Sequence, residues 1–159
     1  MQDLDHLLEH LKGKVVICGI GSTLRSDDGI GSLLASRIHG KVPYIVYDAG
    51  SSPENYLGKI IKDKPDTVVL VDAVDFGGLP GEFRVVEPED IQTVNFFSTH
   101  NASISLAINY LKADLQADII VLIIQPKRIN FGDTMSEEVS KTLDMLEEWF
   151  MAVNKKELE

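Results

Sequence analysis

Five acidic side chains lie at or just after the ends of three apolar runs. They are Asp27, Asp28, Asp48, Asp72 and Asp75. Carboxylates that are brought together repel one another, and they persist only if they are protonated, solvated or bound to a cation. Two of them with the imidazole of His100 would suit Zn, Ni, Fe or Mn. Open positions on such a metal can polarise a carbonyl or activate a water molecule, so hydrolysis is one chemistry that this set allows.

The elements that must position these acids follow from the hydrophobic pattern. Apolar runs alternate with amphipathic runs, which is typical of a parallel α/β sheet. Strands are expected at 14–20, 43–50, 66–74, 82–86 and 117–126, and helices at 27–38, 51–64, 99–115 and 136–153. In an open α/β sheet, ligands bind outside the carboxyl ends of the parallel strands. The acids are therefore expected to converge at one edge, with His100 at the start of the helix 99–115.

The segment GIGSTLRSDDGIG (19–31) admits two other interpretations. A nucleotide-binding turn is disfavoured, because the dinucleotide fingerprint would need glycine where Leu24 stands and because Asp27 and Asp28 would face the phosphates. A plain strand-to-helix turn stays open, with Ser26 as the N-cap and the two acids favoured by the helix dipole. Taken singly, each acid is a common cap or turn residue, and only their shared position favours a site.

The segment HLLEH (6–10) matches the pattern of inverted zinc peptidases, with His6 and His10 on one helix face. It precedes the first core strand, and short motifs match by chance. We therefore interpret it as an amphipathic N-terminal helix with its leucines packed inward. Those leucines are Leu4, Leu7, Leu8 and Leu11. Cys18 lies inside the first strand and is expected in the core rather than as a nucleophile.

Composition limits the classes of function. Lys and Arg number 15 and Asp and Glu number 25, so the net charge is −10, and a nucleic-acid partner is not expected. The sequence has no run near the ~18 apolar residues of a membrane span and no signal peptide, so membrane insertion is not expected. With a single cysteine, a cytoplasmic location is expected. We expect one domain over 1–159, with a helical N-terminal extension over 1–13.

Five segments in a fixed order carry a family resemblance. They are GIGSTLRSDDGIG (19–31), VYDAGSSPEN (46–55), LVDAVDFGGLPGEFRVVEPEDI (70–91), STHNASISL (98–106) and IIQPKRINFG (123–132). Together they resemble the maturation endopeptidases of nickel–iron hydrogenases, with most similarity to the branch that processes the large subunit of hydrogenase 3. The resemblance implies a three-layer α/β/α sandwich around a mostly parallel twisted sheet, the phosphorylase/hydrolase-like fold.

The resemblance also implies an activity and a site. Such endopeptidases, grouped with the aspartic type, remove the C-terminal extension of the large-subunit precursor after nickel insertion. The nickel comes with the substrate, and no organic cofactor is implied. The residues of this chain that match the family's nickel-contacting and catalytic positions are Asp28, Asp72 and His100. Asp27, Asp48 and Asp75 are candidates to support them through hydrogen bonds or charge.

Two points stay open from the sequence. A non-catalytic module that docks the nickel-bearing precursor without cutting it would share the same residues, and a generic aminopeptidase of similar fold is a weaker alternative. The family usually has asparagine where this chain has Ser22. Both side chains can bond to nearby backbone in a turn, so the expected metal ligands are unaffected.

Overall fold

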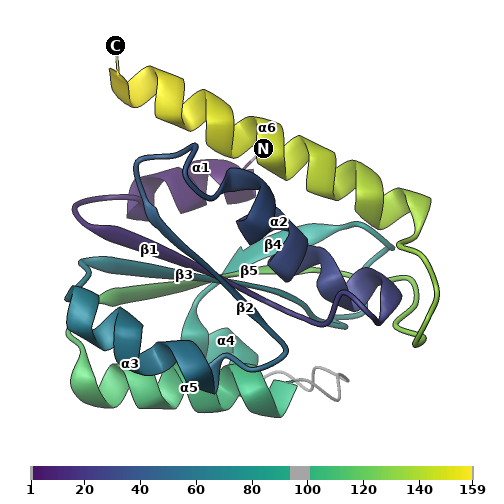
Figure 1. Ribbon diagram of the computed structural model, residues 1–159, viewed down its shortest axis with the longest axis horizontal. Helices are drawn as coiled ribbons and strands as arrows, with labels where there is room; N and C mark the ends of the chain where they lie inside the picture. Colours follow the sequence, from purple (N-terminus) through teal and green to yellow (C-terminus); the bar gives the residue numbers. More distant parts are fainter. Residues whose placement is uncertain (1, 94–100, 159) are drawn as a thin grey trace.

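The computed structural model describes residues 2–93 and 101–158. Within these residues, helices cover both faces of one five-stranded sheet (Figure 1). The elements are α1 (Gln2–His10), β1 (Val15–Ile20), the 3₁₀ turn η1 (Ser26–Gly29), α2 (Ile30–Ile38), β2 (Ile45–Gly50), α3 (Glu54–Asp63), β3 (Thr67–Ala73), β4 (Phe83–Val86), α4 (Pro88–Thr93), α5 (Asn101–Asp114), β5 (Asp118–Ile124) and α6 (Glu137–Leu158).

The strand order β2-β1-β3-β5-β4 determines where the acidic residues gather. The strands β2, β1, β3 and β5 run parallel, and β4 runs antiparallel to β5 at the edge. The chain leaves β1 to one side to form β2 and returns on the other side to form β3. The sheet therefore has its topological switch point between β1 and β3, where open α/β sheets bind their ligands. All five expected strands are confirmed, with boundaries that differ by at most two residues.

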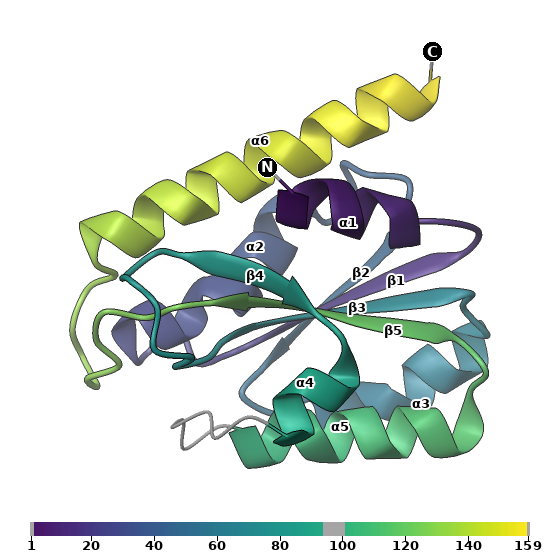
Figure 2. The same ribbon diagram turned by 180° about the vertical axis from the view of Figure 1, so that it is seen from behind.

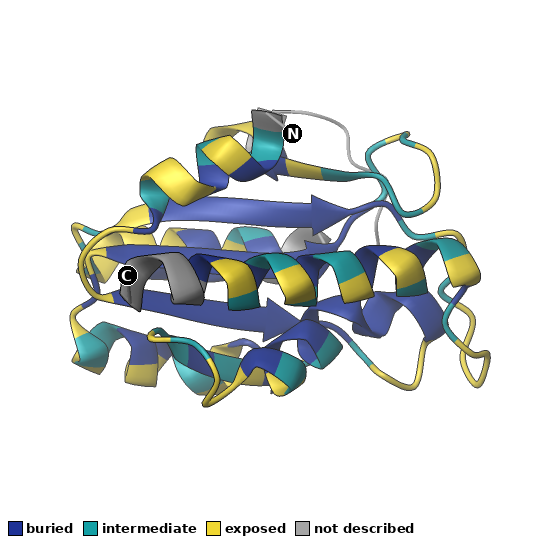
Figure 3. Cartoon of the chain, turned by 90° about the horizontal axis from the view of Figure 1, so that it is seen from above, coloured by how far each residue is buried: buried dark blue, intermediate teal, exposed yellow. Residues whose placement is uncertain are grey.

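Two separate apolar layers hold the helices on the sheet, as expected for an α/β/α sandwich. One layer packs α1, α2 and α6 on one face, and the other packs α3, α4 and α5 on the opposite face (Figures 1 and 2). The central strands are buried from end to end, with every residue of β1 and β3 buried (Figure 3). Continuous β-branched runs suit such two-sided burial. None of the described helices is both long and apolar enough to cross a bilayer.

Two glycines let α2 approach the sheet closely. A Cβ atom at Gly31 would lie 2.4 Å from the carbonyl oxygens of both Ile20 and Val71, and one at Gly19 would lie 2.0 Å from the Gly31 carbonyl. These positions accept no side chain without a shift of the backbone. The glycines of the first motif therefore serve helix–strand packing at the switch point.

Two predictions about helices are wrong in one detail each, namely the N-cap before α2 and the burial of one leucine in α1. Ser26 does not cap a helix: it has φ 53° at the head of η1, and its hydroxyl donates to the Thr134 carbonyl at 2.7 Å. This hydrogen bond stabilises the positive φ of Ser26, which is a backbone conformation that does not occur within an α-helix. In α1, Leu4, Leu7 and Leu11 are buried as expected, but Leu8 is 40% exposed because it faces away from the sheet.

The helix–sheet contact yields a paired stability prediction. Gly31→Ala is expected to lower the free energy of unfolding by about 3 kcal/mol, because the new methyl group overlaps two strand carbonyls. Gly58→Ala is the matched control, since Gly58 lies in α3 and a Cβ atom added there would meet no atom within 4 Å. That variant is expected to raise stability by about 0.5–1 kcal/mol. Urea unfolding of both variants measures the difference, and equal effects would contradict the close packing.

Candidate active site

Asp72 is the most unusual polar residue of the sheet. It lies near the carboxyl end of the central strand β3 and is 1% exposed. Neither of its carboxylate oxygens has a hydrogen-bond partner among the residues that the structure describes. A buried charge without partners is costly, so such a group calls for a cation, a proton or a substrate.

The surroundings of Asp72 act on its protonation. Burial is the main cause that raises the pKa of Asp72 well above its usual value, and the charge of Asp28 raises it further. The neighbouring Ala73 amide opposes this rise only in part. The two carboxylates therefore interact across the switch point, and burial with a neighbouring negative charge favours the neutral form of Asp72.

Asp28 is held beside this strand end by the loop that follows β1. It is 2% exposed, and its Oδ2 accepts a hydrogen bond from the Ser22 amide at 2.9 Å. The Ser22 hydroxyl in turn accepts one from the Leu24 amide at 3.3 Å. The serine that replaces the family's asparagine thus keeps the local turn bonding expected of it.

A pocket of about 140 Å³ opens at Asp28. Its walls come from the end of β3 and from the loop after β5, with Ala73, Asp75 and residues 126–129 in the lining. A second hollow of about 350 Å³ lies on the other side of the Asp28 loop and is lined by 21–23, Ser32 and 48–51. The carboxyl edge of the sheet therefore offers space for a bound chain on both sides of the Asp28 loop.

Asp27, although it adjoins Asp28, has a different task. Its side chain is fully buried, and Oδ2 accepts from the amides of Lys127 (2.8 Å) and Arg128 (3.1 Å). The Ser136 amide donates to Oδ1 at 2.7 Å and the Ser136 hydroxyl to Oδ2 at 2.8 Å. Charge-assisted bonds of this kind are strong. Asp27 thereby fixes the loop that forms one wall of the pocket.

Asp75 and Asp48 occupy the flanks of the site. Asp75 Oδ1 accepts bonds from the Gly77 amide and from Gln125 Nε2, both at 3.1 Å. Asp48 is exposed on β2, where its Oδ1 accepts from the Ser32 hydroxyl at 2.5 Å and the Gly50 amide at 3.1 Å. Hydrogen bonds thus hold both carboxylates in place at this edge of the sheet.

Gln125 is a positioning residue that the sequence pattern did not single out. It is 7% exposed at the end of β5, and its Oε1 accepts bonds from the Phe76 amide at 2.9 Å and the Gly78 amide at 3.0 Å. Its amide nitrogen donates to Asp75. The signal was present in the sequence, because a polar side chain follows the six apolar residues 119–124 directly before Pro126.

Two further expectations concern a histidine and a cysteine. His100 lies outside the described residues, so its place at the head of α5 stays a prediction. Cys18 is 1% exposed in β1, and burial, followed by the charges of Asp72 and Asp48, raises the pKa of its thiol to about 12. A thiol held neutral in this way is no nucleophile, which confirms its assignment to the core.

Comparison with known proteins identifies the family that this geometry belongs to. The family model of the hydrogenase maturation proteases of HycI type matches residues 29–152. The hydrogenase 3 maturation protease of Escherichia coli K12 is 35% identical over 132 residues, which are 82% of this chain and 83% of that protein. A putative hydrogenase maturation protease of Methanocaldococcus jannaschii is 33% identical over 154 residues, 88% of this chain and 89% of its own length.

Solved structures agree in fold as well as in sequence. The crystal structure of the nickel–iron hydrogenase maturation protease HycI from Thermococcus kodakarensis has a TM-score of 0.83 at 35% identity, over 94% of this chain and 99% of that one. The solution structure of the endopeptidase HycI from E. coli has a TM-score of 0.79 at 32% identity, over 88% and 90%. These matches bear out an endopeptidase rather than a docking module without activity. The chain belongs to the HycI family of hydrogenase maturation proteases.

Proposed function

We propose that this protease removes the C-terminal extension from the large-subunit precursor of a nickel–iron hydrogenase after nickel insertion. In this proposal Asp28, Asp72 and His100 recognise the nickel that the precursor carries. One observation supports it above all others: the Asp72 carboxylate is buried beside Asp28 with no hydrogen-bond partner among the described residues. No organic cofactor is part of the proposal.

The donor set fits a nickel ion delivered by the substrate. Carboxylate oxygens and an imidazole are ligands that suit divalent first-row metals. A cation between Asp28 and Asp72 would relieve the repulsion that raises the pKa of Asp72. A precursor that lacks nickel offers no such relief, so the site discriminates between the loaded and the unloaded substrate.

The residues of the site then act on a peptide that the metal end holds in place. Fixing the scissile bond near the carboxylates supplies proximity, which is a large part of many rate enhancements. Asp28 lines the open pocket and is the general base that we propose for the attacking water. Asp27 and Gln125 keep the pocket walls fixed and do not touch the substrate.

The rim of the site offers an apolar surface to the precursor. Leu24 is 64% exposed and Phe131 is 70% exposed, and the Gly132 amide donates to the Leu24 carbonyl at 2.9 Å. These side chains thus stand on two loops that are bonded to each other beside Asp28. Exposed large apolar groups next to a site mark contact surfaces.

Cleavage of a purified precursor tests the proposed recognition. Nickel-loaded precursor is expected to lose its tail peptide, as followed by mass spectrometry, and nickel-free precursor is expected to stay intact. Even the outer partners of metal ligands change activity by ~10–100-fold, so loss of a ligand in Asp72→Asn or His100→Ala is expected to lower kcat/KM by at least ~100-fold. His39→Ala and Asp114→Asn, which remove the same groups from exposed positions elsewhere, serve as matched controls. Equal cutting of the nickel-free precursor would refute the recognition of nickel.

A pH series on the metal-free protein tests the state of Asp72. Because the pKa of folded Asp72 lies above the unfolded value of 3.8, the folded protein holds a proton that the unfolded chain releases. The contribution of Asp72 to the free energy of unfolding is therefore fully present below the unfolded pKa. It is lost as pH rises through the folded pKa. The Tm of Asp72→Asn minus that of the wild type is expected to increase as pH rises above about 4, at ~2–4 °C for each kcal/mol. Parallel Tm curves would contradict the assignment.

The apolar rim gives a separate prediction about the precursor. Leu24→Ser and Phe131→Ser are each expected to raise KM about 5-fold, because each loses part of the burial free energy of one large apolar side chain. The value of kcat is expected to stay the same, since both side chains are exposed and neither belongs to the proposed catalytic set. Leu8→Ser, an exposed leucine of α1, is the control. Steady-state kinetics that show a change in kcat alone would exclude a docking role.

A further inference from the structure

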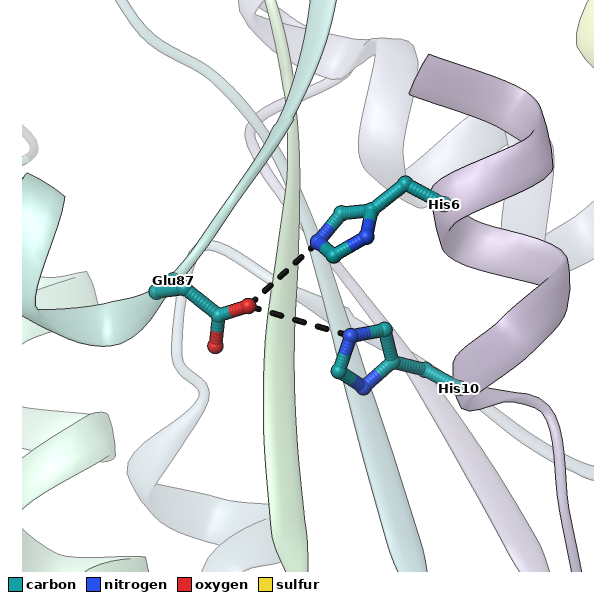
Figure 4. Close-up of side chains that lie close together, drawn as sticks. All are labelled: His6, His10 and Glu87. Atoms are coloured by element: carbon teal, nitrogen blue, oxygen red, sulfur yellow. Dashed lines mark hydrogen bonds and ion pairs between the residues drawn. The ribbon is translucent and has the colours of Figure 1, made fainter. Parts of the chain in front are cut away.

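Two histidines and two acids gather at the edge of the sheet opposite the carboxyl ends. His6 and His10 project from α1 toward Glu87, which follows β4 directly (Figure 4). Asp118 stands at the amino end of β5, beside His10. Asp28 and Asp72 lie at the other ends of the parallel strands, so this group belongs to neither wall of the proposed active site.

The geometry of the group resembles a metal site with small adjustments. Glu87 Oε1 lies 3.3 Å from His6 Nε2 and 3.7 Å from His10 Nε2. One donor atom from each of the three residues lies within 4.8 Å of the others. Bonds of ~2.0–2.1 Å to a tetrahedral Zn²⁺ place neighbouring donor atoms ~3.3 Å apart. Small side-chain rotations therefore suffice to close a three-donor shell.

Helical spacing and ring orientation support the same interpretation. Residues four apart lie on one face of a helix, and the two rings meet edge to face with centroids 4.7 Å apart. Both Nε2 atoms thereby turn to the same carboxylate oxygen. The HLLEH motif contains Glu9, but Glu9 does not belong to the group of donor residues. The third donor residue is Glu87, which comes from a segment far along the chain.

Asp118 sets the chemistry of His10. It bonds to His10 Nδ1, and a carboxylate accepts in such a bond, so in the neutral ring that makes it the lone pair of Nε2 is turned to Glu87. A neutral Nε2 and a carboxylate oxygen are both acceptors, and they stay side by side only with a proton or a cation between them. A carboxylate that holds the far nitrogen of a histidine is the usual partner of a metal-bound imidazole.

The group is also accessible to ions. The side chains of His6 and Glu87 are 41% and 43% exposed, whereas that of His10 is 18% exposed. A hydrated ion can therefore enter from solvent and meet one largely buried, oriented ligand. The net charge of −10 favours the approach of cations.

We propose that His6, His10 and Glu87 form a second metal site, which binds a divalent transition ion of the Zn²⁺ type with water as the fourth ligand. The site fastens α1 to the strand end of β4. It is independent of the proposed nickel recognition, because it shares no residue with Asp28, Asp72 or His100.

Zinc titration of the chelator-treated full chain by calorimetry tests the proposal. The background Asp72→Asn/His100→Ala removes the proposed nickel ligands, and one equivalent of Zn²⁺ is expected to bind in it. Adding His6→Ala and His10→Ala to that background is expected to weaken binding at least ~100-fold, since two of three ligands are lost. Adding His39→Ala instead is expected to change nothing, because His39 is an exposed histidine at the end of α2. Unchanged binding without His6 and His10, or no binding in the background, would overturn the site.

Two further variants keep the test independent of folding. Asp118→Asn is expected to weaken zinc binding about 10–100-fold through the orientation of His10, and Glu87→Gln removes the third ligand at an exposed position. In the Asp72→Asn/His100→Ala background, zinc is expected to raise the Tm, and after the addition of Glu87→Gln it is expected to leave the Tm unchanged, because only a bound metal stabilises the folded state. Circular dichroism of the metal-free variants verifies that they fold, and a Tm rise of equal size in Glu87→Gln would refute the proposal.

Discussion

The close approach of α2 to β1 and β3 is the contact on which the active edge depends. Gly31 lies against the carbonyls of Ile20 and Val71, so α2 crosses the sheet where the strand order reverses. Its leading turn η1 must then sit directly over the ends of these strands. Asp28 of that turn acts on Asp72 for this reason, and a larger residue at the contact would move both the helix and this carboxylate. Packing and chemistry are therefore set by the same backbone contact.

Two buried acids at this edge, Asp27 and Asp72, differ in how the protein compensates their charge. Asp27 accepts four hydrogen bonds from the loop after β5 and from the start of α6, so its charge is compensated within the protein. Asp72 has no such compensation among the described residues, and its pKa rises instead. A buried carboxylate of this kind costs stability when it is charged and has no partner. A carboxylate whose pKa is raised by burial and by a neighbouring charge is typical of functional sites.

Much of the fold was predictable because its signals are local. The β-branched runs indicated the strands, Gly40 ends α2 in the left-handed region at φ 76°, and Ser136 begins α6 by accepting from the Val139 amide at 3.4 Å. The position of Asp72 followed from the parallel-sheet rule. The separate task of Asp27 did not, since its partners lie 100 or more residues away and the local pattern favours a simple helix acid. The turn at Ser26 could not be predicted for the same reason, because the Ser26 hydroxyl bonds to the distant Thr134.

For the histidines of α1, the local motif indicates the wrong acidic partner. HLLEH names Glu9 as the partner acid, but helical geometry and the sheet order bring Glu87 and Asp118 to the imidazoles instead. These partners become visible only once β4 is known to run antiparallel beside β5, because that pairing places the end of one strand next to the start of the other. The sheet thus positions acids at both of its edges. At the carboxyl ends of the parallel strands, Asp28 and Asp72 are buried close together, and this raises the pKa of Asp72. At the opposite ends, Glu87 and Asp118 are accessible and contact the imidazoles of α1.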